Sequence, residues 1–432
     1  MKRIQRILTI LLASILSACS TPPGQHHIDA EKTLSASPDF SADCPYFSFD
    51  HMGNPVLCWT EKNLSEGVTR LAFARYDITT GAFGTRIVVP GSEGIRASPE
   101  STGKIAFKSD GTIIAVFAKP FPEEKNPFAG AIYYSLSSDA GASWSPPRFL
   151  HSDTSHHYGR NFFDLAQLGN GEVGAVWLDG RDQSIEGSAL YFSSTGSSGG
   201  FTNETIVHSG TCECCRTDLL VDKNGMIHVA YRSLTYPSSL AGKQVRDMAY
   251  VHSTDNGKTF SPESVISPDH WAIQACPHTG PALAWENGRL HAIWFTAGGG
   301  AGLYYTSMQI GSSTFNNRQM LTETGSHPQA AAIGPDTVYV VYENRSMDPP
   351  NRHGMAGGNR HGQDQHEISH TSGSPILLHP VINGIPAEPI RLSSDGTHNH
   401  HPVIANVAGS VLVAWVCEDG NRSTIRYRAL WP

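Results

Sequence analysis

The sequence predicts an all-β fold, a β-propeller in which seven blades are favoured and six are the alternative. The first observation is a repeated unit: a strand, a glycine or asparagine turn, and a β-branched strand that ends in an aromatic residue. The unit recurs about every 50 to 70 residues, with no helical period between copies. The second observation is composition. Only 16% of residues are charged, whereas 42 are glycine and 27 are proline, which suits short strands and turns.

Seven copies of this unit predict the blades. Each sheet can bury its faces only against its neighbours, so the blades must close into a ring. The last copy ends at "IRYRALWP", one strand short, and we expect a segment near residues 30–42 to complete it. The copies are "GNPVLCW", "GTIIAVF", "GEVGAVW", "GMIHVAY", "GRLHAIW", "DTVYVVY" and "SVLVAW", and they end at Trp59, Phe117, Trp177, Tyr231, Trp294, Tyr342 and Trp415.

The amino terminus predicts export and a lipid anchor. Three basic residues precede the apolar stretch 7–16, which has the length of a signal peptide and is too short to span a bilayer comfortably. "LSAC" at 16–19 resembles the bacterial lipobox, so we expect a signal peptide over residues 1–18 and lipidation of Cys19. An ordinary signal peptide is the alternative. Residues 19–42 are polar and are expected to form a flexible tether to a propeller over 43–432.

Charge and hydropathy narrow the expected partners. Removing the three cations of the leader takes the formal charge from −8 to −11, so no nucleic-acid partner is expected. No later apolar run reaches transmembrane length, so we expect contact with the membrane through the anchor alone. Ser20, rather than Asp, follows Cys19. This favours a lipoprotein of the cell envelope, anchored to the outer membrane on its periplasmic or surface face. We expect the propeller to be a monomer.

Two predicted hairpins carry the pattern Ser-x-Asp-x-Gly-x-Ser/Thr-Trp/Phe, known as an Asp-box. They read "SSDAGASW" (137–144) and "STDNGKTF" (253–260). The aspartate can accept hydrogen bonds from amides of its own turn, the glycine allows a left-handed backbone, and the aromatic ring packs back on the sheet. The residues concerned are Asp139, Gly141, Trp144, Asp255, Gly257 and Phe260.

Together with the repeat, these hairpins make residues 43–432 resemble the sialidase superfamily of Asp-box, or BNR, propellers. The resemblance implies a six-bladed ring as the usual case. For an active member it implies three arginines that bind the substrate carboxylate, a Tyr nucleophile assisted by Glu, and an Asp acid/base. The family's first arginine lies in an Arg-Ile-Pro motif, which this chain lacks. Arg96, Arg160 and Arg216 are candidate positions, and no Tyr–Glu pair can be assigned.

Cysteines and histidines recur where the chain enters the innermost strand of a blade. That entry lies beside the central channel, about fifteen residues before each repeat aromatic. Segments far apart in the sequence, "DCPYF", "CECCR", "ACPHTGP", "GSHPQ" and "THNHHP", would therefore meet around one axis. Thiolates and imidazoles are ligands of Zn²⁺ and copper, and thiolates favour Cu(I). The predicted metal ligands are Cys212, Cys214, Cys215, Cys276, His278, His327 and His400.

Disulfides are the main alternative for these cysteines, because exported proteins are normally oxidised. Seven cysteines remain besides Cys19, so at least one has no partner within the chain. Cys58 and Cys417 occupy equivalent strand ends in the first and last blades and could bridge the ring closure. Cys276 could pair with a cysteine of the CxCC motif.

One further motif is not expected to act. "HEISH" at 366–370 matches the pattern of zinc proteases, which requires a helix to stack the two histidines. The repeat places it on a strand, where His366 and His370 would stand about 13 Å apart. Three hypotheses for function therefore remain: a copper- or zinc-binding pore site, a sialidase-type glycoside hydrolase acting on a glycan, and a disulfide-stapled scaffold that binds a small molecule or glycan.

Overall fold

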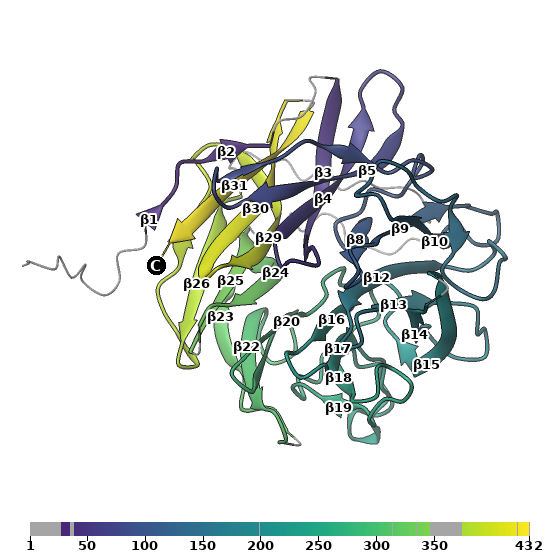
Figure 1. The fold of residues 1–432 in the computed structure, drawn as a ribbon. Coiled ribbons are helices and arrows are strands. Elements are labelled where there is room, and N and C mark those ends of the chain that lie inside the picture. The colour runs from purple at the N-terminus through teal and green to yellow at the C-terminus, as the bar shows by residue number, and fades with distance from the viewer. Residues whose placement is uncertain are drawn as a thin grey trace, which may run out of the picture.

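The computed structural model describes residues 27–34, 39–197, 199–312, 314–334, 336–345, 374–420 and 422–431. Within these ranges the chain forms seven antiparallel sheets arranged as a ring (Figure 1). The favoured prediction of seven blades is confirmed. The short 3₁₀ turn η1 (Ser238–Leu240) is the sole helical element in the described ranges, and no described helix has the length and hydropathy to cross a membrane.

The first three blades follow one another in chain order. Blade one holds β3 (Phe40–Phe49), β4 (Pro55–Asn63), β5 (Thr69–Asp77), β6 (Ala82–Phe83) and β7 (Ile87–Val88). Blade two holds β8 (Lys104–Phe107), β9 (Ile113–Pro120), β10 (Gly130–Ser137) and β11 (Arg148–Phe149). Blade three holds β12 (Arg160–Gln167), β13 (Val173–Asp179), β14 (Ser188–Thr195) and β15 (Phe201–Thr211).

The remaining blades complete the ring. Blade four holds β16 (Asp218–Val221), β17 (Ile227–Arg232), β18 (Met248–Ser253) and β19 (Ser264–Val265). Blade five holds β20 (Ala282–Glu286), β21 (Arg289–Thr296), β22 (Gly302–Gln309) and β23 (Gln319–Thr322). Blade six holds β24 (Gly325–Ala332), β25 (Thr337–Asn344), β26 (Ile376–Ile382), β27 (Ile385–Pro386) and β28 (Ile390–Arg391). Blade seven holds β29 (His398–Val407), β30 (Ser410–Asp419) and β31 (Arg422–Trp431).

The amino-terminal segment closes the ring. β1 (His27–Ile28) and β2 (Lys32–Thr33) both pair with β31 and supply the outer edge of blade seven. The missing strand was expected near 30–42: β2 lies inside that range, and β1 lies before it. Part of the expected tether, residues 27–33, is thus hydrogen-bonded into the propeller, because the edge of β31 would otherwise present unpaired backbone groups.

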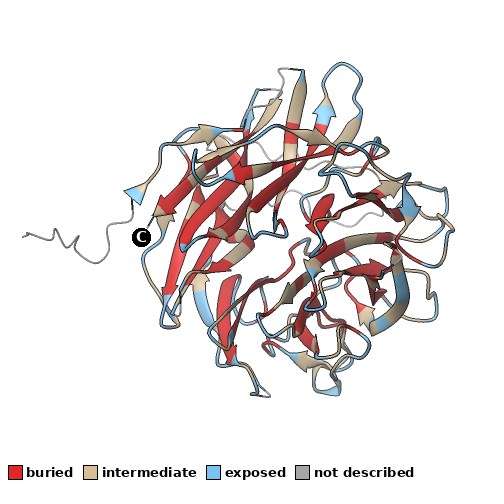
Figure 2. Ribbon diagram, in the orientation of Figure 1, coloured by how far each residue is buried: buried red, intermediate tan, exposed pale blue. Residues whose placement is uncertain are grey.

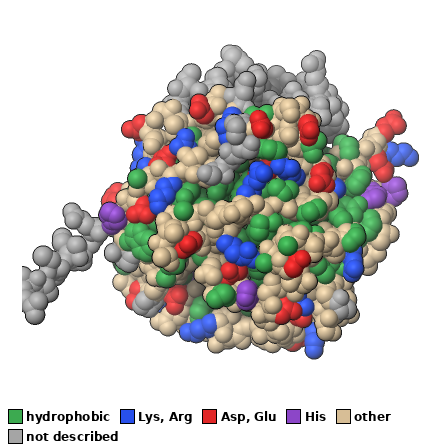
Figure 3. Space-filling view, turned by 45° about the horizontal axis from the view of Figure 1, so that its top comes forward, with side chains coloured by type: hydrophobic (Ala, Val, Ile, Leu, Met, Phe, Trp, Pro, Cys, Tyr) green, Lys and Arg blue, Asp and Glu red, His purple; other side chains and the backbone are tan. Residues whose placement is uncertain are grey.

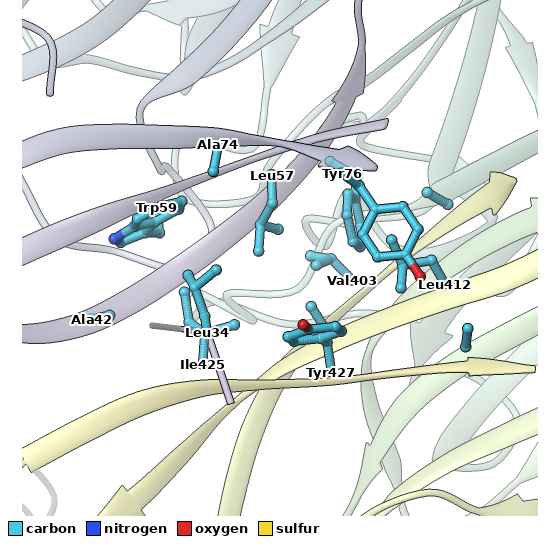
Figure 4. Packing of buried hydrophobic residues seen from close by; sticks show 14 of the residues in the cluster. Leu34, Ala42, Leu57, Trp59, Ala74, Tyr76, Val403, Leu412, Ile425 and Tyr427 are labelled. Atoms are coloured by element: carbon cyan, nitrogen blue, oxygen red, sulfur yellow. The ribbon is translucent and has the colours of Figure 1, made fainter. Parts of the chain in front are cut away.

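The repeat aromatics form the packing between blades. All seven are at most 1% exposed. Each packs against the blade that precedes it, as Trp177 does on blade two and Trp294 on blade four. Figure 2 shows the buried residues following the strands of every blade. Figure 4 shows the interface that closes the ring, where Trp59 and Leu57 of blade one meet Ile425 and Tyr427 of blade seven.

Four innermost strands share a backbone irregularity near the channel. Cys44, Phe162, His327 and His401 all adopt a left-handed backbone, with φ between 50° and 54°. At each of them the register of the strand shifts against its neighbour, which marks a β-bulge. Residues other than glycine rarely adopt the left-handed backbone conformation, because it costs energy. Residues that do adopt it are often found at functional sites.

The two predicted Asp-box turns have the hydrogen bonds expected of them. Asp139 accepts the amide of Ser143 at 2.8 Å, and Asp255 accepts that of Thr259 at 3.0 Å. Gly141 and Gly257 have φ of 96° and 81°. The two aromatic residues pack between blades: Trp144 contacts Phe73, and Phe260 contacts Phe192.

Candidate functional site

A cavity of about 390 Å³ lies at the centre of the ring, lined by residues of the innermost strands. Charged side chains gather along it. Lys104 donates to Asp164 at 2.8 Å, and the Tyr46 hydroxyl donates to the same carboxylate at 2.8 Å. Asp218 accepts the amide of Leu283 at 2.7 Å. Burial, followed by the charge of Asp164, raises the pKa of Asp218 to about 7.

Three of the predicted ligands lie together in the turn that joins blade three to blade four. Cys212 follows β15, and its amide donates to the carbonyl of Arg232 at 2.9 Å. Its Sγ lies 3.4 Å from that of Cys214 and 3.6 Å from that of Cys215. All three side chains are buried, and they pack with Leu234 and Phe162. The CxCC motif therefore brings three sulfurs into one cluster.

The loop that enters blade five brings two more donors. Sγ of Cys276 and a ring nitrogen of His278 lie within 4.8 Å of Cys214 Sγ and of each other. Unlike the first three, Cys276 and His278 are exposed. Cys214 belongs to both groups, so it is the common member of a five-donor set. We call Cys212, Cys214, Cys215, Cys276 and His278 the cysteine site.

The charge around the cysteine site favours a thiolate at Cys212. Hydrogen bonds with the thiols of Cys214 and Cys215, together with the nearby Arg246 guanidinium, hold the pKa of Cys212 well below its ordinary value. Arg246 Nη1 donates to Cys212 Sγ at 3.0 Å. By contrast, hydrogen bonds with Cys212, Cys215 and Cys276, followed by burial, raise the pKa of Cys214. One thiolate is thus stabilised before any ligand arrives.

The other two predicted ligands, His327 and His400, lie in a different group. His400 Nδ1 is 2.6 Å from His401 Nδ1, and His401 Nδ1 is 3.7 Å from Asp43 Oδ1. The ring of His327 lies 5.5 Å from that of His401. Among the described residues, no set of donors within 4.8 Å of one another joins these histidines to the cysteines. The prediction of one site built from all seven residues is therefore wrong: the blades that carry them lie on two sides of the channel mouth.

An ion pair lies between the two sides. Arg216, directly after Cys215, donates to Glu100 Oε1 at 2.8 Å and to the carbonyls of Pro281 and Pro328. Glu100 also accepts the amide of Gly280 at 2.9 Å. Because these partners come from blades two, five and six, Arg216 holds the mouth of the channel together.

The three candidate arginines do not form an anion-binding triad. Arg160 has a fully buried side chain that pairs with Asp153 and Asp179. Arg216 lines the cavity, but its guanidinium forms an ion pair with Glu100. Arg96 is not among the residues that line the cavity; burial lowers the pKa of its guanidinium. The tyrosine at the cavity, Tyr46, has a pKa raised well above its ordinary value by burial and by Asp164, which opposes its ionisation to a nucleophile.

The proposed staple between Cys58 and Cys417 is also wrong. Cys58 belongs to the core between blades one and two, and its sulfur donates to the carbonyls of Tyr46 and Gly103. Trp415, two residues before Cys417 on the same face of β30, packs toward blade six. The two sulfurs therefore point to opposite neighbours. All seven cysteines of the described ranges are unbonded.

Several polar residues of the site were not predicted from the sequence. Glu343 follows the repeat aromatic Tyr342, and its carboxylate bonds to His327 and Arg345. Asp43, Glu100 and Arg246 carried no motif that would have identified them. Cys19 and the "HEISH" motif lie outside the described residues.

No protein-family model matches the chain, and no curated protein sequence matches it. Solved structures do. The polysaccharide lyase Uly1 is 13% identical with a TM-score of 0.54, over 96% of this chain and 94% of the lyase. A Dyadobacter fermentans protein of unknown function is 14% identical with a TM-score of 0.49, over 95% and 99% of the two chains. The Hadza microbial sialidase Hz136 is 12% identical with a TM-score of 0.46, over 86% and 75%.

These likenesses concern the fold. Sialidases and an α-L-arabinanase are also among the similar structures, with TM-scores below 0.5. All the identities are below 25%, so activity must be argued from this chain's own residues.

Proposed function

We propose that the protein binds a metal ion that accepts thiolate ligands, Cu(I) or Zn²⁺, in the cysteine site. The observation that carries the proposal is that four donors from two separate loops lie close to a fifth, Cys214. Four of the donors are sulfurs, the preferred ligands of these ions. A structural role alone would not require thiols from two blades to meet at the mouth of the channel.

The spacing of the sulfurs supports a metal better than a disulfide. A Zn–S bond is about 2.3 Å, so tetrahedral sulfur ligands stand about 3.8 Å apart. The separations of 3.4 and 3.6 Å are close to that value. A disulfide would require about 2.05 Å. The charge of Arg246 next to Cys212 supports the same proposal, because a metal ligand must be a thiolate.

The test compares metal content and affinity in matched variants. The full chain, purified in detergent without chelators, is expected to carry copper or zinc, whereas Cys214→Ser loses it and binds Cu(I) at least about 100-fold more weakly in competition with a chromophoric chelator. Cys58→Ala is the control, because that buried thiol lies between blades one and two. Equal metal content and affinity in wild type and Cys214→Ser would overturn the proposal.

A glycan-active enzyme is the second candidate. The cavity, with Tyr46, Lys104 and Asp164 in contact, has a size suited to a sugar, and the similar structure Uly1 is described as a polysaccharide lyase. Release of methylumbelliferone from a sialoside and formation of unsaturated uronate from acidic polysaccharides test it. No turnover above a Lys104→Met, Asp164→Asn control would remove this candidate.

We also propose that lipidated Cys19 anchors the propeller to the outer membrane, on the basis of the leader sequence. Metabolic labelling with a palmitate analogue and membrane fractionation are expected to show label and membrane association that Cys19→Ala loses. Label in that variant would contradict the anchor.

A further inference from the structure

We propose that Asp43, His400 and His401 form a second metal site, which takes a borderline divalent ion such as Zn²⁺, Co²⁺ or Cu²⁺. We call these residues the histidine site. It goes beyond the cysteine site, since its donors are nitrogen and oxygen, it lies on blades one and seven, and it shares no residue with the cysteine site.

The donor atoms converge as a two-histidine, one-carboxylate set. His401 Nδ1 lies between His400 Nδ1, at 2.6 Å, and Asp43 Oδ1, at 3.7 Å. Tetrahedral ligands bound at about 2.0 to 2.2 Å stand about 3.3 to 3.6 Å apart, so the observed separations lie on either side of that range. A small adjustment of three side chains would place all three donors on one ion.

A carboxylate holds one of the two rings in the orientation that ligation requires. His400 Nε2 lies 3.1 Å from Glu418 Oε1. If that nitrogen carries the proton, the lone pair is on Nδ1, which faces the other donors. Metal-bound histidines almost always donate their second ring nitrogen in this way. Glu418 is thus positioned to fix the tautomer of His400.

The bulge in β29 explains how two consecutive residues meet. Neighbouring side chains of a regular strand point to opposite faces, so adjacent histidines would normally diverge. The left-handed backbone of His401, with φ of 50°, brings its ring within 4.3 Å of the His400 ring. Asp43 directly precedes Cys44, the equivalent bulge residue of β3. The bulges in β3 and β29 thus bring Asp43 close to His400 and His401.

The site has access to the central cavity. His401 and His327 both line it. His327 is held through Nδ1 by Glu343, and its Nε2 lies 4.0 Å from Glu100. Three protein ligands leave coordination positions open to water or a substrate, as in catalytic rather than closed structural sites. The chemistry of imidazole and carboxylate suits borderline divalent ions and not Cu(I).

Co²⁺ is the probe that separates the two sites, because thiolate ligands give it a charge-transfer band that nitrogen and oxygen ligands do not. Full-length protein in detergent, stripped of metal, is titrated with Co²⁺ and followed by absorbance and equilibrium dialysis. We expect wild type to bind a nitrogen- and oxygen-ligated equivalent that His400→Gln/His401→Gln loses. His157→Gln, an exposed histidine on blade three's entry loop, is the control.

The outcomes distinguish this proposal from that of the cysteine site. Loss of the charge-transfer band in Cys214→Ser, with a visible Co²⁺ spectrum retained, supports the histidine site. If His400→Gln/His401→Gln binds as much Co²⁺ as wild type, or if Cys214→Ser binds none, the histidine site is overturned. Absence of the charge-transfer band in wild type counts against the cysteine site alone. Should the double variant unfold, Asp43→Asn, whose side chain is 38% exposed, replaces it with the same expected loss.

Discussion

The two sides of the channel mouth differ in how the fold supplies their polar groups. On the cysteine side, the donors come from loops that connect one blade to the next, and a tight turn buries three sulfurs. On the histidine side, they come from bulges within the innermost strands themselves. The same end of the channel thus carries sulfur donors where the loops between blades supply them. It carries nitrogen and oxygen donors where bulges in the innermost strands supply them.

The charged side chains that contact the donor groups differ between the two sides. Arg246 stands next to the thiols and stabilises a thiolate. Carboxylates stand next to the imidazoles, where Glu418 and Glu343 accept from ring nitrogens. On the face shown in Figure 3, cationic and anionic side chains are intermixed.

Removing the ion pair between the two sides should have the largest effect. In Arg216→Met, the Glu100 carboxylate loses its buried cation, and we expect the free energy of unfolding to fall by about 3 to 5 kcal/mol. Guanidinium denaturation measures it. Arg345→Met is the matched control: its side chain is 57% exposed, so loss of its pairing with Glu343 should cost about 1 kcal/mol or less. Equal losses would show that Arg216 is not a structural link between the sides.

Asp218, in the cavity between the two sides, should make stability depend on pH. Its folded-state pKa of about 7 lies above its ordinary value of 3.8, so its protonated form contributes stability that is lost as the pH rises from about 4 to 7. Asp218→Asn should remove a decline on the order of 1 to 4 kcal/mol over that range. Denaturation at several pH values, with the exposed Glu323→Gln as control, checks this; parallel curves for wild type and Asp218→Asn would contradict it.

The histidine side should depend on its supporting carboxylate. Glu418→Gln removes the charge that orients His400, and we expect Co²⁺ affinity at the nitrogen- and oxygen-ligated site to fall about 10- to 100-fold. The thiolate charge-transfer band should not change. Asp419→Asn, the adjacent exposed carboxylate, is the control. An equal loss of Co²⁺ affinity in Asp419→Asn would show that the effect comes from the net charge of the region and not from the contact between Glu418 and His400.

The cysteine side should depend more weakly on its cation. Arg246→Gln removes the guanidinium beside Cys212, and we expect the pKa of that thiol to rise by about one unit, equivalent to a tenfold lower thiolate population where it titrates. Thiolate absorbance against pH measures it. Lys243→Gln, an exposed cation of the same loop, is the control. An unchanged titration would show that the neighbouring thiols alone stabilise the thiolate.

The fold could be predicted because one physical requirement recurs. Every blade needs a large side chain to fill the gap to the blade before it, so Trp59, Trp177 and Trp415 identify the blades in sequence. The range expected for the closing strand contains β2 but not β1, because both strands are two residues long and carry no alternation of polar and apolar residues. Their position depends on pairing with β31.

The site could be predicted only in part. The CxCC spacing identified Cys212, Cys214 and Cys215 because their proximity is local. Counting back from the repeat aromatics brought Cys276 and His278 to the correct end of the channel. The same count could not show that His327 and His400 lie across the mouth, because a repeat gives position along a blade and not separation around the ring. Asp43 reaches His401 by a pairing between the first and last blades that no sequence pattern encodes.

The attachment of β1 and β2 to β31 has a mechanical consequence. A pull on the amino terminus is transmitted first to the few hydrogen bonds that hold these short strands to the last blade. These bonds should break before those within any other blade, which would leave the interface between blades seven and one held by the packing of its buried side chains. Asp43 of blade one and His401 of blade seven face each other across this interface. Tension along the chain would therefore reach them before it reached the sulfurs.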